Sequence, residues 1–199
     1  MKNNYIVQAW LVLLLSVFYG GALAGVQLTL SPKIEENKIN ETRQQIPALV
    51  LGADRANETV DMESQTLSLE KNGRQVFYSV YKAFYNGEPA GWVIKSSGQG
   101  YADKIELLVG VNADLSAITG LFILNQKETP GLGNKIIETA WRQQFIQKPT
   151  GQGLTVVKTG AKAINEIDAI SGATISSRAV CTIINGTLND VKGQLSAAN

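Results

Sequence analysis

The sequence predicts an α+β fold: a single exported domain, built as an antiparallel sheet with packed helices, behind one N-terminal transmembrane helix. Three features predict this class: an uncharged apolar run near the N-terminus, strand-like segments separated by turns, and a C-terminal stretch with helical periodicity. Strands followed by packed helices are typical of α+β domains. We expect three parts: a transmembrane anchor at 1–25, a stalk helix and linker at 26–54, and the domain at 55–199.

Composition narrows the classes of function. The net charge is +1, and no basic run or stripe is present, which argues against a nucleic-acid partner. The chain has no histidine, so the usual general base and the usual metal ligand are missing. A lone cysteine, Cys181, excludes an intramolecular disulfide and a cysteine metal cluster. Its place in an apolar helical stretch predicts a buried, inert thiol.

The N-terminal apolar run covers Ile6 to Leu23 without a charge. Its length is close to the roughly 20 residues that cross a bilayer as a helix. Ala22-Leu23-Ala24 resembles a signal-peptidase site, so a cleaved signal is one interpretation. A retained anchor is favoured, because Lys2 is the only charge before the run and the run is long for a signal. Under either interpretation we expect the domain to be exported. With the favoured retained anchor, we expect an inner (cytoplasmic) membrane location, single-pass, with the domain on the periplasmic (extracytoplasmic) side.

The stalk and the sheet follow in order. Ser31-Pro32 is typical of an N-cap with proline at the first helical position, and it predicts a helix that ends before Pro47. Residues 55–70 are weakly patterned and carry no prediction. Asn86-Gly87 is a strong hairpin signal. Aromatic and β-branched residues predict a four-stranded antiparallel meander, with strands at 75–85, 90–95, 105–111 and 118–124.

The last third of the chain predicts helices around loops. Glu128 to Gly133 is a loop, because proline and two glycines oppose regular structure. Asn134 is expected to cap a helix whose buried side holds Ile136, Ile137, Ala140, Trp141 and Phe145. Residues 154–158 predict a short strand. A final helix is predicted from an apolar face formed by Ile175, Ala179, Val180, Ile183, Ile184, Leu188, Val191 and Leu195.

Hydroxyl side chains gather where this final helix begins: Ser171, Thr174, Ser176 and Ser177. A helix start offers free backbone N–H groups and the positive end of the helix dipole, so an anion is stabilised there. The Thr174 hydroxyl therefore lies where a phosphate would bind well. A plain N-cap explains the same residues, and on this ground alone both interpretations stay open.

Two motifs carry a resemblance to a known family. Asp168-x-x-Ser171-Gly-Ala-Thr174 resembles the flavinylation motif of the covalent-FMN-binding domain family, in which a flavin transferase joins FMN to the last threonine through a phosphoester. The loop Glu128-Thr-Pro-Gly-Leu-Gly133 resembles the family's second hallmark. The resemblance implies that FMN is bound covalently through Thr174. It also implies an FMN site that includes Ser171, Gly172, Ala173, Glu128, Thr129, Gly131 and Leu132.

The resemblance also implies roles outside the FMN site. Asp168 is expected to serve the transferase, as a recognition or metal-binding residue, because a carboxylate next to a phosphate repels it. The implied function is electron transfer within a membrane-bound, ion-translocating oxidoreductase complex of the Rnf type. The implied partners are the other membrane subunits and the flavin transferase, with no catalytic acid or base and no resident metal. The alternative is an exported flavin- or ligand-binding module with a sensory or scaffolding role.

Overall fold

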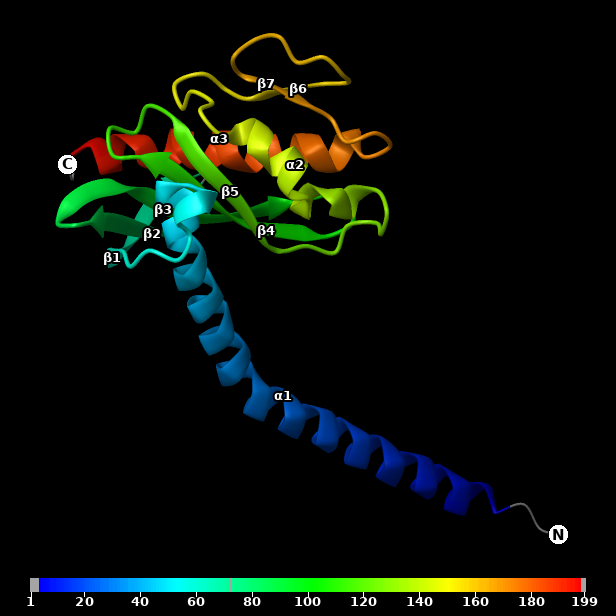
Figure 1. Ribbon diagram of the computed structural model, residues 1–199. Helices are drawn as coiled ribbons and strands as arrows, with labels where there is room; N and C mark the ends of the chain where they lie inside the picture. Colours follow the sequence, from blue (N-terminus) through cyan, green and yellow to red (C-terminus); the bar gives the residue numbers. More distant parts are fainter. Residues whose placement is uncertain (1–3, 72, 198–199) are drawn as a thin grey trace. The chain divides into compact units, whose positions relative to one another are not determined.

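A computed structural model describes residues 4–71 and 73–197 (Figure 1). It divides into two compact units, Met1–Glu41 and Thr42–Asn199. The first unit is formed by the long helix α1, which spans Tyr5–Leu51 and ends inside the second unit. Its apolar part is long and apolar enough to cross a membrane, and the side chains there are not buried by the protein. The second unit holds the sheet and all the other helices.

The prediction of a separate stalk helix is wrong, because α1 runs without a break through both prolines. Ser31 does not cap a new helix: its hydroxyl donates to the Gln27 carbonyl, one turn earlier, at 2.7 Å. A proline inside a helix removes one hydrogen bond and costs about 3 kcal/mol. At Pro47 this cost is opposed by packing, because Ile46 and the next turn are buried on the sheet.

The end of α1 packs very closely against the sheet. Leu49 lies over Gly110 and Gly120, where a β-carbon would collide with the Leu49 backbone or side chain. The Thr119 hydroxyl donates to the Leu49 carbonyl at 2.6 Å, which satisfies one of the free carbonyls at this helix end. Gly52 then ends the helix with a φ of 96°, a conformation that glycine adopts readily.

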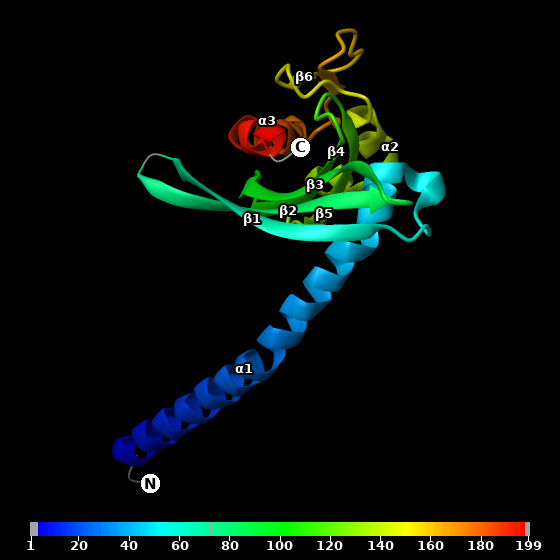
Figure 2. The ribbon, with the colours of Figure 1, turned by 90° about the vertical axis from the view of Figure 1, so that its left-hand side faces the viewer.

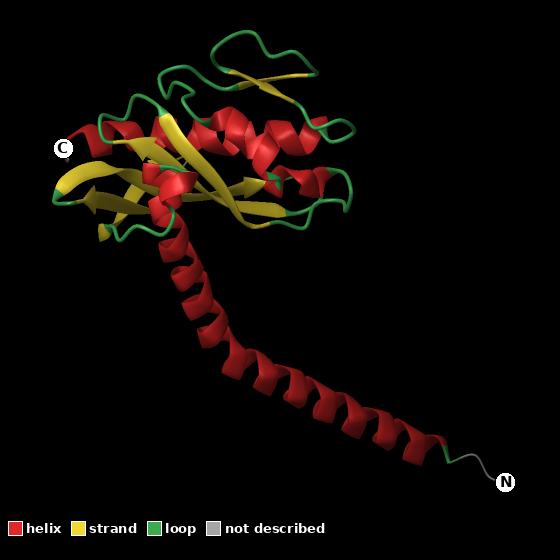
Figure 3. Cartoon of the chain, in the orientation of Figure 1, coloured by secondary structure: helices red, strands yellow, loops and turns green. Residues whose placement is uncertain are grey.

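The sheet has five antiparallel strands in sequence order (Figure 3). Their bounds are β1 Asp61–Lys71, β2 Arg74–Tyr85, β3 Glu88–Gln99, β4 Lys104–Asn112 and β5 Ile118–Asn125. The predicted meander corresponds to β2 to β5, and β1 adds a strand at the edge. The β2–β3 turn has positive φ at both Asn86 and Gly87, as a two-residue hairpin of this kind requires.

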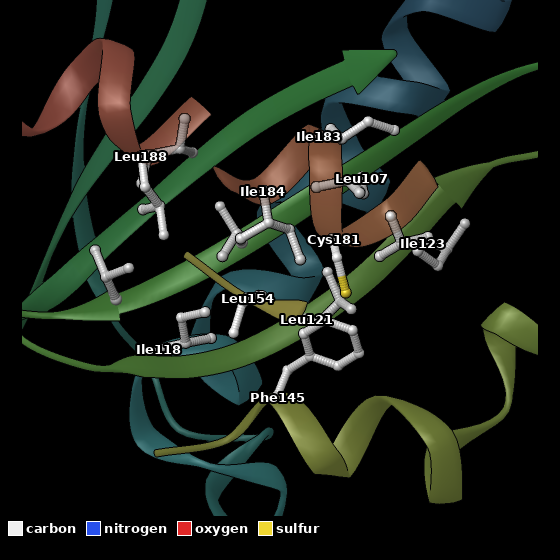
Figure 4. Packing of buried hydrophobic residues seen from close by; sticks show 14 of the residues in the cluster. Leu107, Ile118, Leu121, Ile123, Phe145, Leu154, Cys181, Ile183, Ile184 and Leu188 are labelled. Atoms are coloured by element: carbon white, nitrogen blue, oxygen red, sulfur yellow. The ribbon is translucent and has the colours of Figure 1, made fainter. Parts of the chain in front are cut away.

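The other face of the sheet is covered by α3, Thr174–Ala197, as Figure 2 shows. Between β5 and α3 lie η2 (Gly133–Ile137), α2 (Thr139–Arg142), η3 (Gln143–Phe145) and a parallel pair, β6 (Thr155–Val157) and β7 (Glu166–Asp168). These elements and α3 bury one continuous apolar core, part of which is drawn in Figure 4. The predicted short strand is found as β6.

Two predictions about the helices need correction. The expected helix after Asn134 is broken into short pieces, so Ile137 and Ala140 are exposed while Trp141 is buried. Short 3-10 turns repeat every three residues, and this changes which positions face the core. Asn134 does not cap a helix; its buried Oδ1 has no hydrogen-bond partner. On α3, Ile175 is 57% exposed, whereas the rest of the predicted face is buried or partly buried.

The lone cysteine behaves as predicted. Cys181 lies in the core between α3 and the sheet, with 3% of its surface exposed (Figure 4). Burial raises the pKa of its thiol to about 12. Because the thiolate is the reactive form, this cysteine is inert at neutral pH.

Candidate functional site

A tight turn sets the direction of the chain as it begins α3. Gly172 has a φ of 77°, and the Ala173 amide donates to the Ile170 carbonyl at 2.9 Å. Ser177 closes the turn from behind: its hydroxyl accepts from the Ile170 amide and donates to the Ala173 carbonyl, both at 3.0 Å. Thr174 is thereby held, half-buried, as the first residue of α3.

The first turn of α3 leaves backbone donors free. The first intrahelical acceptor is the Ala173 carbonyl, which takes the Ser177 amide. The amides of Thr174, Ile175 and Ser176 precede it, and a helix gives such groups no partner of its own. Together with the helix dipole they form an anion-binding position beside the Thr174 hydroxyl.

Glu128 holds this helix start against two loops. Its carboxylate is 4% exposed; Oε2 accepts from the Ser176 hydroxyl at 2.5 Å, and Oε1 accepts from the Ala102 amide at 3.1 Å. A buried carboxylate is stable only when its oxygens are hydrogen-bonded, and here each oxygen has one donor. The residue thus joins α3, the β3–β4 loop and the loop after β5.

Two glycines make room for that carboxylate. A β-carbon at Gly100 would collide with Glu128 Oε1, and one at Gly133 would lie 2.7 Å from Ser176 Oγ and 2.9 Å from Glu128 Oε2. Neither glycine has a positive φ, so the reason for glycine at both positions is space rather than backbone conformation. The Glu128 contact and these two glycines therefore form one packed unit.

An open cleft lies in front of this unit. Its volume is about 560 Å³, within the range of about 300–1,000 Å³ that small-molecule sites occupy. Three apolar side chains at its rim are well exposed: Tyr101 at 61%, Leu132 at 44% and Ile175 at 57%. The full lining is Tyr101, Thr129, Leu132, Gly133, Gly172, Ala173, Thr174, Ile175 and Ser176.

Most of the predicted site residues meet at this cleft, although they come from two segments about forty residues apart. Five of the eight line it: Thr129, Leu132, Gly172, Ala173 and Thr174. The other three do not. Ser171 and Gly131 are exposed outside the lining, and Glu128 is buried behind it.

The predicted FMN site did not include four of the lining residues: Tyr101, Gly133, Ile175 and Ser176. Of these, Ser176 belongs to the predicted hydroxyl cluster and Gly133 to the hallmark loop. Tyr101 lies outside both motifs, so the motifs gave no signal for it. For Ile175 the sequence pattern was misleading, because its spacing predicts a position on the buried face of the helix rather than at a cleft.

Asp168, at the end of β7, forms hydrogen bonds that hold neighbouring segments of the fold together. Its Oδ1 accepts from the Ala161 amide at 2.8 Å, and its carbonyl accepts from the Trp141 indole at 2.9 Å. It does not line the cleft. Within residues 4–71 and 73–197, no group of three acidic, cysteine or histidine side chains is placed to hold a metal ion.

Comparison with known proteins identifies the family of the chain. Residues 100–189 match the FMN-binding domain family, and this stretch includes every segment of the cleft. The chain is 31% identical over 174 residues to the G subunit of the ion-translocating oxidoreductase complex of Methanosarcina acetivorans, covering 87% of this chain and 88% of that protein. The chain belongs to the G-subunit family of these complexes.

A second relative in this family is the G subunit of the Na(+)-translocating ferredoxin:NAD(+) oxidoreductase complex of Acetobacterium woodii. It is 38% identical over 127 residues, which cover 63% of this chain and 60% of that protein. The matched stretch therefore spans less than two thirds of the length of this relative.

Two solved structures share the fold. NqrC of Shewanella oneidensis superposes with a TM-score of 0.64 at 20% identity, covering 79% of this chain and 99% of that one. The C subunit of the Na(+)-translocating NADH-quinone reductase of Parabacteroides distasonis gives 0.62 at 24% identity, covering 84% and 96%. The predicted α+β fold is confirmed.

Proposed function

We propose that this chain is the electron-transfer subunit of a membrane-bound, ion-translocating oxidoreductase complex, with FMN joined to Thr174 through a phosphoester. The observation that carries the proposal is the position of Thr174. Its hydroxyl belongs to the first residue of a helix, beside free backbone donors, inside the cleft that the FMN-binding family match covers. FMN supplies the electron-transfer chemistry, and the protein contributes its position and surroundings.

The residues of the cleft suit both ends of FMN. The phosphate would lie at the α3 N-terminus, where the amides of the first turn are donors. The flat ring would lie against the apolar side chains of Tyr101, Leu132 and Ile175, which are otherwise exposed to water. The hydroxyl of Thr129 is available at the same cleft as a polar partner.

Glu128 stabilises this arrangement without opposing the phosphate directly. Both carboxylate oxygens accept hydrogen bonds from protein donors, one from the hydroxyl of Ser176 and one from the amide of Ala102. We infer that Glu128 positions the walls of the cleft and does not bind FMN itself. This changes its predicted role from ligand to support.

The membrane and the partners complete the proposal. We propose that residues 6–23 remain as an anchor in the inner membrane and that the domain faces the periplasm. The partners would be the other membrane subunits of the complex and, during maturation, a flavin transferase. Asp168 lies close in sequence to the exposed Ser171-Gly172 turn, and we retain it as a recognition residue for the transferase.

The test is a denaturing gel viewed for flavin fluorescence, after coexpression of the full chain with a flavin transferase. The wild type should give a fluorescent band, and Thr174→Val should give none, because valine keeps the shape and lacks the hydroxyl. Ser171→Ala is the matched control at the same turn and should only weaken the band. A fluorescent Thr174→Val band would show that the attachment residue is wrong.

A further inference from the structure

A second groove lies away from the FMN cleft, along the edge strand β5. Its walls come from the last turns of α1 with the following turn η1 (Ala53–Arg55), from residues 119–122 of β5, and from α2 with residues 143–146. Its volume is about 240 Å³, and none of its lining residues belongs to the FMN cleft. The proposed redox site therefore gives this groove no role.

The surface of the groove is apolar and built largely from small residues. Ala48, Gly52 and Ala53 form one side, and they face residues 119–122 of β5, where Leu49 already lies over Gly120. Ile146 stands at the rim and is 44% exposed. Small residues let the backbone of a neighbouring segment approach closely, and an exposed apolar rim is stabilised when another protein covers it.

Arg142 brings a positive charge into this groove. Three of its donors are used within the domain: Nε donates to the Ile137 carbonyl and Nη1 to the Leu121 carbonyl, both at 2.9 Å, and Nη2 donates to the Thr139 hydroxyl at 3.3 Å. A guanidinium has five N–H donors, so two remain.

The charge of Arg142 has no acidic partner among the residues that the structure describes, because no carboxylate there forms an ion pair with it. Partial burial lowers the pKa of the guanidinium, as expected for a charge removed from water without a counterion. A carboxylate delivered from outside would fit the two remaining donors in a forked geometry.

We propose that this groove is the docking site for an apolar segment of a neighbouring membrane subunit, and that a carboxylate on that segment pairs with Arg142. The inference rests on the proposed function, because that function supplies the neighbouring membrane protein. Docking of a protein segment is favoured over binding of a lipid because the small-residue surface admits a backbone. The groove also offers the amides of Gln45 and Gln143 to that backbone.

The first experiment fills the groove. The complex is purified from membranes through a tag on another of its proteins, with this chain present either as wild type or as Ala53→Trp. Ala53 is exposed, so the variant should fold and keep a normal fluorescent flavin band. We expect at least a tenfold drop in the amount of chain retained by the complex. Retention equal to the wild type would overturn the proposal.

The matched control is Ala163→Trp, which places the same side chain on an exposed loop outside both the groove and the FMN cleft. Its retention should equal that of the wild type. The two proposals fail separately in this experiment. A missing flavin band in the wild type would contradict the proposed function, whereas full retention of Ala53→Trp with a normal band would contradict only the docking site.

A second experiment tests the charge and identifies the occupant. Arg142→Lys keeps the charge and should be retained several-fold better than Arg142→Met; equal retention of the two would overturn the ion pair. A photo-crosslinking residue in place of Ile146 should join to a peptide of a membrane subunit that contains Asp or Glu. Crosslinking to lipid alone, or to no protein of the complex, would overturn the assignment of the occupant.

Discussion

The C-terminus of α1 and the N-terminus of α3 are docked on the domain by similar means, and they differ in what they leave open. Each uses one hydrogen bond from a hydroxyl, a partly buried one from Thr119 to the Leu49 carbonyl in α1 and a buried one from Ser176 to Glu128 in α3. Each also uses a pair of glycines where a side chain would collide. The same physical device therefore serves both helix ends.

The difference lies in the groups that remain exposed. At the end of α1 the contact is neutral and closed, because a carbonyl is satisfied and the glycines lie directly under the helix. At the start of α3 the contact is behind the helix, so the amides and the Thr174 hydroxyl still face a cleft. Contacts with the rest of the domain can thus either cover a helix end or leave its backbone groups open to a ligand, depending on which side of the helix they lie.

The largest effect should come from Glu128→Ala. It leaves the Ser176 hydroxyl and the Ala102 amide without an acceptor, and each loss costs about 1–3 kcal/mol. The two losses sum to about 2–6 kcal/mol, so at about 2–4 °C for each kcal/mol in a chain of this size we expect the melting temperature to fall by roughly 4–24 °C. Flavin attachment should also fall several-fold, because the cleft loses its support.

Glu128→Gln is the control for that prediction. Glutamine has the same shape, its oxygen can accept from Ala102, and its amide can donate to the Ser176 hydroxyl. Neutral hydrogen bonds are roughly half as strong as charged ones, so stability and attachment should both be intermediate. If the alanine variant attached flavin as well as the wild type, the distinction between the two helix ends would be wrong.

At the α1 end, Gly110→Ala should change stability alone. The added carbon would press on the Leu49 carbonyl and on the Thr119 side chain, and overpacking of this kind costs about 1–3 kcal/mol. Thermal unfolding should show the loss, while the fluorescent flavin band keeps its intensity. Gly186→Ala in α3 has no atom within 4 Å of the new carbon and should raise stability, by about 0.5–1 kcal/mol.

A smaller effect is expected from Thr119→Val. It removes the donor to the Leu49 carbonyl and keeps the volume of the side chain, so the loss should be about 1 kcal/mol. Denaturant unfolding of the full chain in detergent would measure it. A loss of flavin attachment in this variant would mean that the two helix ends are coupled through the sheet.

The smallest effect concerns pH and a contact far from both ends. Asp190 of α3 accepts from Lys71 at 2.8 Å and from the Tyr78 hydroxyl at 2.6 Å. Burial alone would raise the pKa of its carboxyl, but these two donors and the Lys71 charge together hold the pKa below its usual value.

Because this pKa is depressed on folding, the stabilisation is complete above the usual carboxyl pKa of about 4 and is lost as pH falls through the folded value. Asp190→Asn should therefore be less stable than the wild type at neutral pH, and the gap should close at acid pH. Unfolding curves at a series of pH values would measure it. A difference in stability between the two proteins that does not change with pH would contradict the stabilising role assigned to the ionised Asp190 carboxylate.

The fold was predictable where local pattern and packing agree. Strands β2 to β5 alternate apolar and polar residues or form buried runs, and the Asn86-Gly87 turn sets their first hairpin. β1 lacks this signal, because as an edge strand it exposes most of its side chains. The continuity of α1 past Pro47 depends on packing against strands far along the chain, so the local sequence pattern does not predict it.

The site was predictable in its parts and not in its arrangement. The two motifs indicated Thr174 and the loop before it, and the structure brings them to one cleft. The role of Glu128 could not be read from the motif, because its partner Ser176 lies 48 residues later and the contact depends on tertiary packing. Ile175 was assigned to the wrong face: the buried residues of the first turn of α3 are Ser176 and Ser177, and Ile175 is exposed.

The open front of the cleft has a consequence for handling the protein. A reduced flavin on Thr174 would lie in a cleft that is open to solvent, and reduced flavins react with dissolved oxygen. Enzymes suppress such side reactions by closing the site. Dissolved oxygen should then reoxidise the flavin faster on the isolated chain than on the same chain within the complex. The rate of flavin reoxidation therefore reports how well the neighbouring proteins shield the cofactor.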